Sequence, residues 1–92
     1  MPRLRARVDV NHPEIVAALR QVGASVQSLA TIGQGCPDLL VSYAARHVLL
    51  EVKSPGGTLT PDEAAWIDRC GGPVYVVYTV EDALAAIGIT VT

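Results

Sequence analysis

The sequence predicts a single α/β domain, residues 1–92, in which helices flank a mixed β-sheet in the order α-β-β-β-α-β-α. Three observations predict this class. Helix start and stop signals bracket three segments with helical apolar spacing, short apolar and β-branched runs lie between them, and a chain of 92 residues has room for one core. With 50% hydrophobic and 17% charged residues, the chain is also too apolar for the disordered class.

The first helix is expected over residues 12–22. Asn11 stands before it as the expected N-cap, and Pro13 and Glu14 follow in its first turn. Apolar residues then recur at helical spacing until Gly23, which supplies a left-handed stop.

A strand, a loop and a hairpin are expected next. The strand covers residues 24–29, and a glycine-bearing loop covers 31–37. Strands over 39–43 and 47–53 are separated only by the short link 44–46, so we expect them to pair as an antiparallel hairpin.

A helical crossover is expected after the hairpin. Residues 54–57 break the strand, and Thr60 and Glu63 form a capping box for a helix from 61 to about 69. The apolar run 74–78 suits a strand buried on both faces. The remaining elements are a last helix over about 80–87 and a final strand segment within 89–92.

Composition excludes several classes of protein. No apolar run approaches the roughly 18 residues of a membrane span, and no signal-peptide core follows Arg3, Arg5 and Arg7, so a cytoplasmic protein is expected. Cys36 and Cys70 have no metal-binding spacing and are expected to be free thiols. The net charge of −2 gives no overall sign of nucleic-acid binding.

Charged residues are expected to meet where the hairpin strands pair. If position 38 falls near 51 or 52, Asp38 lies beside Glu51, and strand alternation puts Lys53 on the same face as Glu51. Two carboxylates, with the Val52 carbonyl as a third ligand, suit a hard cation such as Mg²⁺. A bound cation lowers the pKa of its water, and Lys53 would orient that water or the phosphate.

A purely structural role for these residues is the alternative to a metal site. An aspartate after a proline is often only a turn former, and a Glu-x-Lys pair is common on a solvated edge strand. Leu49 shares the face of Glu51 and makes that face partly apolar, which favours a partnered carboxylate. His12 and His47 are interpreted as structural residues.

Three stretches of the chain carry a more specific pattern. They are Gly35-Cys36-Pro37-Asp38, then Glu51-Val52-Lys53, then Pro55-Gly56-Gly57-Thr58-Leu59-Thr60-Pro61 followed by Trp66. Together they resemble the PD-(D/E)xK nuclease superfamily, and more narrowly its VRR-NUC (virus-type replication-repair nuclease) family. The resemblance spans nearly the whole chain and implies a restriction-endonuclease-like core.

The resemblance also implies roles for individual residues. Asp38 and Glu51 would be metal ligands, Lys53 the catalytic lysine, and Glu14 a further acidic member of the site. Glu14 also fits the second half of a capping box, and this alternative stays open. Where the family usually has glutamine, this chain has Glu63, which either takes the place of that glutamine in the site or only caps the second helix.

The activity implied by the resemblance is metal-dependent endonucleolytic cleavage of DNA, with Mg²⁺ or Mn²⁺ and no small-molecule cofactor. Stand-alone members are expected to form homodimers and to favour branched DNA, either a Holliday junction or a flap. A phage-encoded member would act in the host cytoplasm. Two alternatives stay open: a catalytically silent nucleic-acid-binding or assembly domain, and a restriction-type nuclease, for which the chain has little room for a recognition insertion.

Overall fold

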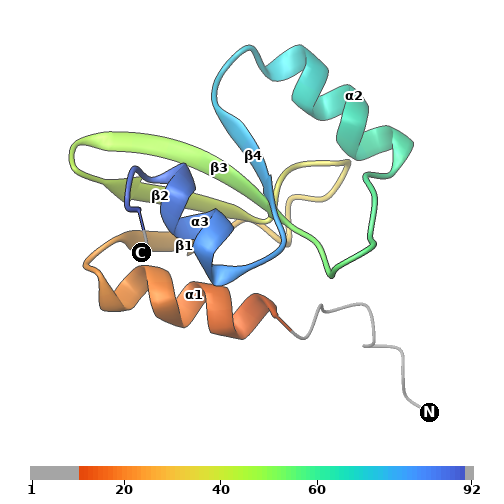
Figure 1. Ribbon diagram of the computed structural model, residues 1–92. Coiled ribbons are helices and arrows are strands. Elements are labelled where there is room, and N and C mark those ends of the chain that lie inside the picture. The colour runs from red at the N-terminus through yellow and green to blue at the C-terminus, as the bar shows by residue number, and fades with distance from the viewer. Residues whose placement is uncertain (1–10, 91–92) are drawn as a thin grey trace.

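The computed structural model describes residues 11–90 and has the expected order of helices and strands (Figure 1). The arginines at positions 3, 5 and 7 lie outside the described residues. The elements are α1 (His12–Gln21), β1 (Ser25–Ser28), β2 (Leu39–Tyr43), β3 (Arg46–Val52), α2 (Pro61–Cys70), β4 (Val74–Val77) and α3 (Val80–Ala86).

The four strands form one mixed sheet in the order β1-β2-β3-β4. β1 pairs antiparallel with β2, and β2 pairs antiparallel with β3, which confirms the expected hairpin. β4 pairs parallel with β3, because the crossover through α2 returns the chain to the same end of the sheet. The sheet is therefore mixed, as the sequence predicts.

The hairpin between β2 and β3 closes on two residues. Tyr43 pairs with Arg46, so the strand begins one residue before the expected position 47. Ala44 and Ala45 both adopt positive φ angles, 53° and 65°. Tight hairpin turns require this conformation because its twist matches that of the strands, although alanine adopts it at a cost.

The core lies between the sheet and two helices on one of its faces. α1 and α3 lie side by side on this face (Figure 1). Their buried side chains form one cluster with those of β2, β3 and β4. The largest fully buried residues of the core are Ile15, Leu19, Leu39, Val41, Leu50 and Val77.

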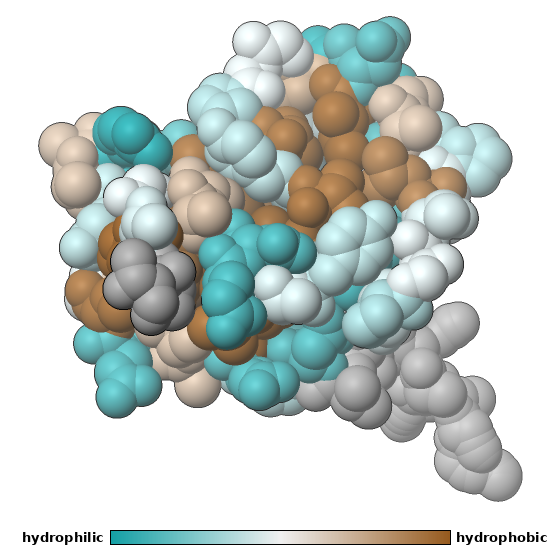
Figure 2. Space-filling model, in the orientation of Figure 1, coloured by the Kyte–Doolittle hydropathy of each residue, from teal (hydrophilic) through white to brown (hydrophobic). Residues whose placement is uncertain are grey.

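The other face of the sheet is incompletely covered. α2 contributes no buried residue, and hydrophobic residues gather on the surface beside β4 and α2 (Figure 2). Leu40, Leu49, Val74 and Val76 lie in neighbouring register positions on this face and are only half-buried. We refer to these four residues as the second apolar face.

The expectation that β4 is buried on both faces is wrong. β4 is an edge strand, and of its four residues only Val77 is buried. Tyr75 is 43% exposed. An apolar run predicts burial only where neighbouring elements cover the strand, and no described strand flanks β4 on its outer side.

Two details at the ends of helices differ from expectation. Asn11 is the N-cap residue of α1, as expected, but its backbone is helical and its side chain makes no capping hydrogen bond. Ile89 and Thr90 are not in a strand, and residues 91–92 lie outside the described range. The Ile89 N–H donates to the Leu84 carbonyl at 2.9 Å, so this segment closes α3 instead of extending the sheet.

Within residues 11–90, no helix has the length and apolar character that crossing a bilayer requires.

Candidate active site

Four charged residues meet at one end of the sheet. Asp38 directly precedes β2, Glu51 lies in β3, Lys53 directly follows β3, and Glu63 lies in the first turn of α2. Three separate elements therefore supply the cluster, which brings together four of the five side chains expected at the site.

The hairpin register places the two expected metal ligands opposite each other. Leu39 pairs with Leu50, and continuing this register puts Asp38 opposite Glu51. Oδ2 of Asp38 accepts a hydrogen bond of 2.8 Å from the N–H of Val52. This bond holds the aspartate against the end of β3, so its position does not depend on a flexible loop.

Pro37 leaves the Val52 carbonyl without a hydrogen-bond donor on the neighbouring strand. The same register puts Pro37 opposite Val52, and the Val52 N–H points toward β2, where it binds Asp38. A residue's carbonyl points to the same side of a strand as its N–H, but proline has no N–H to donate. The carbonyl therefore receives no ladder bond from position 37, which leaves that lone pair free of a bond from β2.

Lys53 is held between two carboxylates. Its Nζ lies 2.8 Å from Oε1 of Glu63 and 3.6 Å from Oε2 of Glu51, and its side chain is 16% exposed. The ammonium group therefore lies beside an expected metal ligand with part of its surface open to solvent.

Glu63 makes both of the contacts that the sequence left as alternatives. Its Oε1 accepts from the Thr60 N–H at 2.9 Å, and the Thr60 hydroxyl accepts from the Glu63 N–H, which completes the capping box. The same Oε1 binds Lys53. A helix-capping residue is thus also part of the charged cluster.

A glycine brings the first turn of α2 close to the loop before Asp38. Gly35 has a φ of +86°, and a Cβ at this position would collide with the Asp62 carbonyl. Only glycine fits both the backbone conformation and the close approach. The loop and the turn that carries Glu63 are therefore packed directly against each other.

Burial and crowding of negative charge dominate the electrostatics of the two expected ligands. Glu51 is 3% exposed, and desolvation, followed by the charges of Asp38 and Glu63, raises its pKa to about 8. Desolvation also raises the pKa of Asp38, against the hydrogen bond from Val52 and the charges of His12 and Lys53, which lower it. A divalent cation between these carboxylates would relieve this repulsion.

Glu63 and Lys53 form the opposite kind of pair. Burial alone would lower the pKa of Lys53, but the hydrogen bond and charge of Glu63 outweigh it and raise this pKa. Burial would raise the pKa of Glu63, and the contact with Lys53 outweighs that effect and lowers it. Both groups are therefore ionised near neutral pH.

The donor set fits a hard divalent cation that keeps part of its water shell. In the part of the chain that the structure describes, no three His, Cys, Asp or Glu side chains are arranged to hold a metal. Asp38 and Glu51 would supply two carboxylates, and the Val52 carbonyl would add a third oxygen. Mg²⁺ is usually held by one or two carboxylates together with waters and substrate phosphate, so a closed three-side-chain cage is not required.

Sequence reasoning missed two residues at this end of the sheet. His12 lies close enough to Asp38 for its charge to lower the aspartate's pKa. The Asn11 side chain binds the backbone of Lys53 and Tyr78. Both residues were assigned to the helix start, and only the docking of α1 against the strand ends reveals their contacts.

Glu14 lies in the first turn of α1, next along the chain from these residues, and is exposed. The ion pairs of the described residues do not include it, and its role in the site stays a prediction.

The cysteines and His47 are not members of the charged cluster. Cys36 and Cys70 are free, as expected, and burial together with the charges of Glu51 and Asp38 raises the pKa of the Cys36 thiol. His47 binds the Ser42 hydroxyl through Nδ1 at 2.7 Å, near the hairpin turn.

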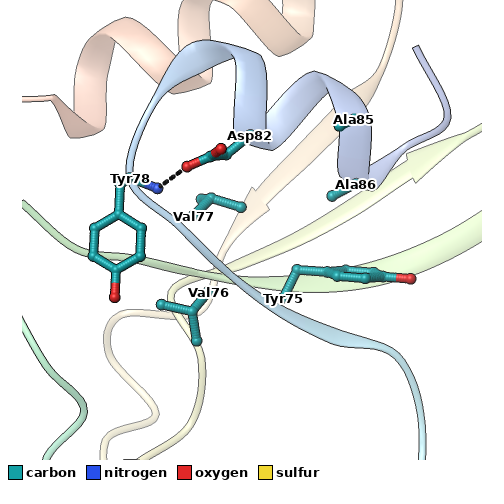
Figure 3. A pocket seen from close by; sticks show the side chains of 7 residues that line it. All are labelled: Tyr75, Val76, Val77, Tyr78, Asp82, Ala85 and Ala86. Atoms are coloured by element: carbon teal, nitrogen blue, oxygen red, sulfur yellow. Dashed lines mark hydrogen bonds between the residues drawn. The ribbon is translucent and has the colours of Figure 1, made fainter. Parts of the chain in front are cut away.

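A hollow of about 440 Å³ lies beside β4 and α3 (Figure 3). Its acidic residue, Asp82, accepts from the Tyr78 N–H at 2.9 Å and from the Thr79 N–H at 3.2 Å, so it serves as a helix cap. The lining shares no residue with the charged cluster. It consists of Tyr75, Val76, Val77, Tyr78, Asp82, Ala85 and Ala86.

Comparison with known proteins bears on the whole site. The family model of the VRR-NUC domain matches residues 3–81, a span that contains every residue of the charged cluster. No curated protein and no solved structure matches the chain.

Proposed function

Because the chain belongs to the VRR-NUC domain family, a family of nuclease-type domains, we propose that it is a metal-dependent endonuclease that hydrolyses phosphodiester bonds in DNA. One observation carries this proposal. The hairpin places Asp38 opposite the buried Glu51, and Lys53 lies 3.6 Å from that glutamate. Two carboxylates beside an ammonium group suit a cation and a phosphate at the same place.

The metal expected in the proposed site is Mg²⁺ or Mn²⁺, held by Asp38, Glu51 and the Val52 carbonyl. When bound, such an ion supplies an acidified water and neutralises charge on the phosphoryl group. Glu51 must give up its proton to serve as a ligand, because its pKa is raised to about 8.

Lys53 supplies a fixed positive charge next to the phosphate. Its ammonium group stays protonated because Glu63 raises its pKa, so in this mechanism it binds and orients rather than accepts a proton. Glu63 holds the lysine ammonium group beside the proposed metal ligands, because its Oε1 lies 2.8 Å from Nζ of Lys53. The capping box with Thr60 in turn fixes Glu63.

The proposed substrate is branched DNA, a Holliday junction or a flap, and the proposed active form is a homodimer. The resemblance to stand-alone VRR-NUC proteins supports the substrate. The second apolar face supports the dimer, because Leu49 and Val76 lie on the same face as Glu51. A second copy that covers this face would bring two sites close together and enlarge the surface that grips DNA.

A cleavage assay tests the proposed function. Labelled four-way junction, flap, linear duplex and single strand are incubated with Mg²⁺, Mn²⁺ or EDTA. We expect metal-dependent cutting of branched DNA that falls at least about 100-fold in Lys53→Ala. Arg69→Ala removes another cation, in the last turn of α2, and is the matched control that should cut normally.

The competing account is a catalytically silent binding or assembly domain. Folded protein that binds these DNAs but cuts none of them with either metal would favour that account. Cutting of linear duplex at one sequence would instead identify a restriction-type nuclease.

A further inference from the structure

Asn11 ties the start of α1 to the ends of two strands. It is the only asparagine in the chain. Its Nδ2 donates to the Lys53 carbonyl at 3.0 Å and to the Tyr78 carbonyl at 2.7 Å. β3 ends at Val52 and β4 at Val77, so each accepting residue directly follows a strand.

The chemistry of its partners fixes the orientation of this amide. Carbonyl oxygens only accept, so the NH₂ group must face them, and both of its hydrogens are used. Within the described residues, Oδ1 is buried without a hydrogen-bond partner. A helix cap would use that oxygen as an acceptor, yet no side-chain cap bond is made. The side chain therefore acts through its two donors.

Asn11 completes the backbone contacts of Lys53. The Lys53 N–H donates to the Val77 carbonyl at 3.0 Å, and the Lys53 carbonyl accepts from Asn11. The chain then enters the turn 54–57, where Gly56 has a φ of +85°. The bond from Asn11 thus holds the lysine's carbonyl at the point where the ladder stops.

The position of that peptide group matters because the lysine side chain is long. Four rotatable bonds separate the backbone from Nζ, which lies 2.8 Å from Glu63 and 3.6 Å from Glu51. A small backbone rotation is amplified along such a side chain. Misplacement of a reacting group by about 1 Å can cost roughly 100-fold in rate.

We propose that Asn11 is a positioning residue for Lys53, holding the backbone that carries the lysine so that its ammonium group meets the phosphate. This inference rests on the proposed function, in which Lys53 acts at the phosphate. The competing view is that Asn11 only anchors α1, in which case its loss lowers stability and leaves the lysine unchanged.

The composition of the chain allows a direct test, because Lys53 is its only lysine. In protein labelled with ¹³C-lysine, the two ε-methylene protons of a held side chain give separate NMR signals. We expect separate signals in the wild type and a merged, sharper signal in Asn11→Ala. The matched control is Val26→Ala, which truncates a side chain packed against the core on β1, the strand farthest from β4, and should keep both signals.

Cleavage kinetics supply the second readout. We expect Asn11→Ala to lower kcat by roughly 10- to 100-fold while KM for DNA changes less than about threefold, because positioning acts on the chemical step. The inference is overturned if Asn11→Ala keeps the separate lysine signals, or if its kcat equals that of Val26→Ala.

A measurement on the wild type covers the case in which Asn11→Ala does not fold. The single asparagine gives one side-chain amide pair, whose exchange with solvent should be at least about tenfold slower than in free asparagine. Free exchange would overturn the inference. If the wild type cuts no DNA, the proposed function fails, and the NMR signals still report whether Asn11 holds Lys53.

Discussion

Glu51 lies inside β3 and is a much weaker acid than an ordinary glutamate. It is 3% exposed, and burial together with the nearby carboxylates raises its pKa to about 8. A buried carboxyl group next to two others is costly to ionise unless a cation joins them. Glu51 is therefore the residue at which the proposed metal binding would be linked to protonation and stability.

The first prediction concerns stability and pH in the absence of divalent metal. The folded protein holds the Glu51 proton more tightly than the unfolded chain, in which the pKa is near 4.5. The contribution of Glu51 to the free energy of unfolding is therefore fully present below pH 4.5 and is lost as pH rises toward 8. Urea unfolding from pH 5 to 9 should show a smaller decline in Glu51→Gln than in wild type. Parallel curves for the two proteins would contradict this assignment.

The second prediction concerns metal uptake. Because Glu51 must be deprotonated to bind Mg²⁺ or Mn²⁺, binding should release a proton below about pH 8, and the apparent affinity should rise with pH up to that value. Calorimetry in two buffers of different ionisation enthalpy measures the released proton. Binding that releases no proton at pH 6 would show that Glu51 is not a ligand.

At the scale of single residues, the sequence predicts the positions of side chains that one hairpin fixes. It does not predict contacts between elements that are far apart in the chain. Asp38, Glu51 and Lys53 could be placed together because strand alternation and a short hairpin link determine their positions. Asn11 and His12 could not, because their contacts depend on how α1 docks against the strand ends.

The first turn of α2 and the loop before Asp38 form one packed unit. Gly35 lies against the Asp62 carbonyl, and Glu63, one residue later, contacts Lys53. A displacement of this turn would therefore reach the lysine.

The third prediction compares two glycines of this loop. Gly33→Ala and Gly35→Ala both place alanine at positive φ, 71° and 86°, but only the second meets the Asp62 backbone. We expect Gly33→Ala to lose about 1 kcal/mol of stability and keep its cleavage activity. Gly35→Ala should lose more stability and at least about tenfold in cleavage rate. Equal activity in the two variants would show that the close approach does not position Glu63.

The fourth prediction concerns the hairpin turn. Asparagine at position 44 and glycine at 45 suit the positive φ angles of 53° and 65° better than alanine. The double variant Ala44→Asn with Ala45→Gly should gain about 1 kcal/mol of stability, measured by urea unfolding, without a change in cleavage rate. Lower stability would mean that the turn differs from the one described.

Helices and strands could be predicted where start and stop signals are local. The capping box of Thr60 and Glu63 and the order of the seven elements are confirmed. The prediction that β4 is buried on both faces was wrong. A run of valines and tyrosines does not indicate which faces and edges of a strand are covered by helices or by other strands.

At the scale of the whole molecule, the helices are distributed unevenly over the sheet. α1 and α3 cover one face, whereas α2 buries no residue and leaves the second apolar face half-exposed. This face includes Leu49, which shares its side of the sheet with the proposed ligand Glu51. A partner seated there would also border the site.

The fifth prediction is that a second copy of the chain occupies this face. Light scattering at micromolar concentration should report a dimer for the wild type and a monomer for Leu40→Glu, which adds a charge to the second apolar face. The control Val22→Glu changes an exposed apolar residue just after α1 and should stay dimeric. A wild-type monomer would contradict the dimer and leave the proposed nuclease site unaffected.

Cleavage of a labelled branched DNA by Asp38→Asn beside the wild type tests the central claim most directly. We predict that the wild type cuts in Mg²⁺ or Mn²⁺ and is silent in EDTA. Asp38→Asn should lose at least about 100-fold in rate while remaining folded, because it removes a ligand charge but keeps an oxygen for the Val52 N–H. Cutting that persists in EDTA, or at an unchanged rate in Asp38→Asn, would contradict a metal-dependent site at this end of the sheet.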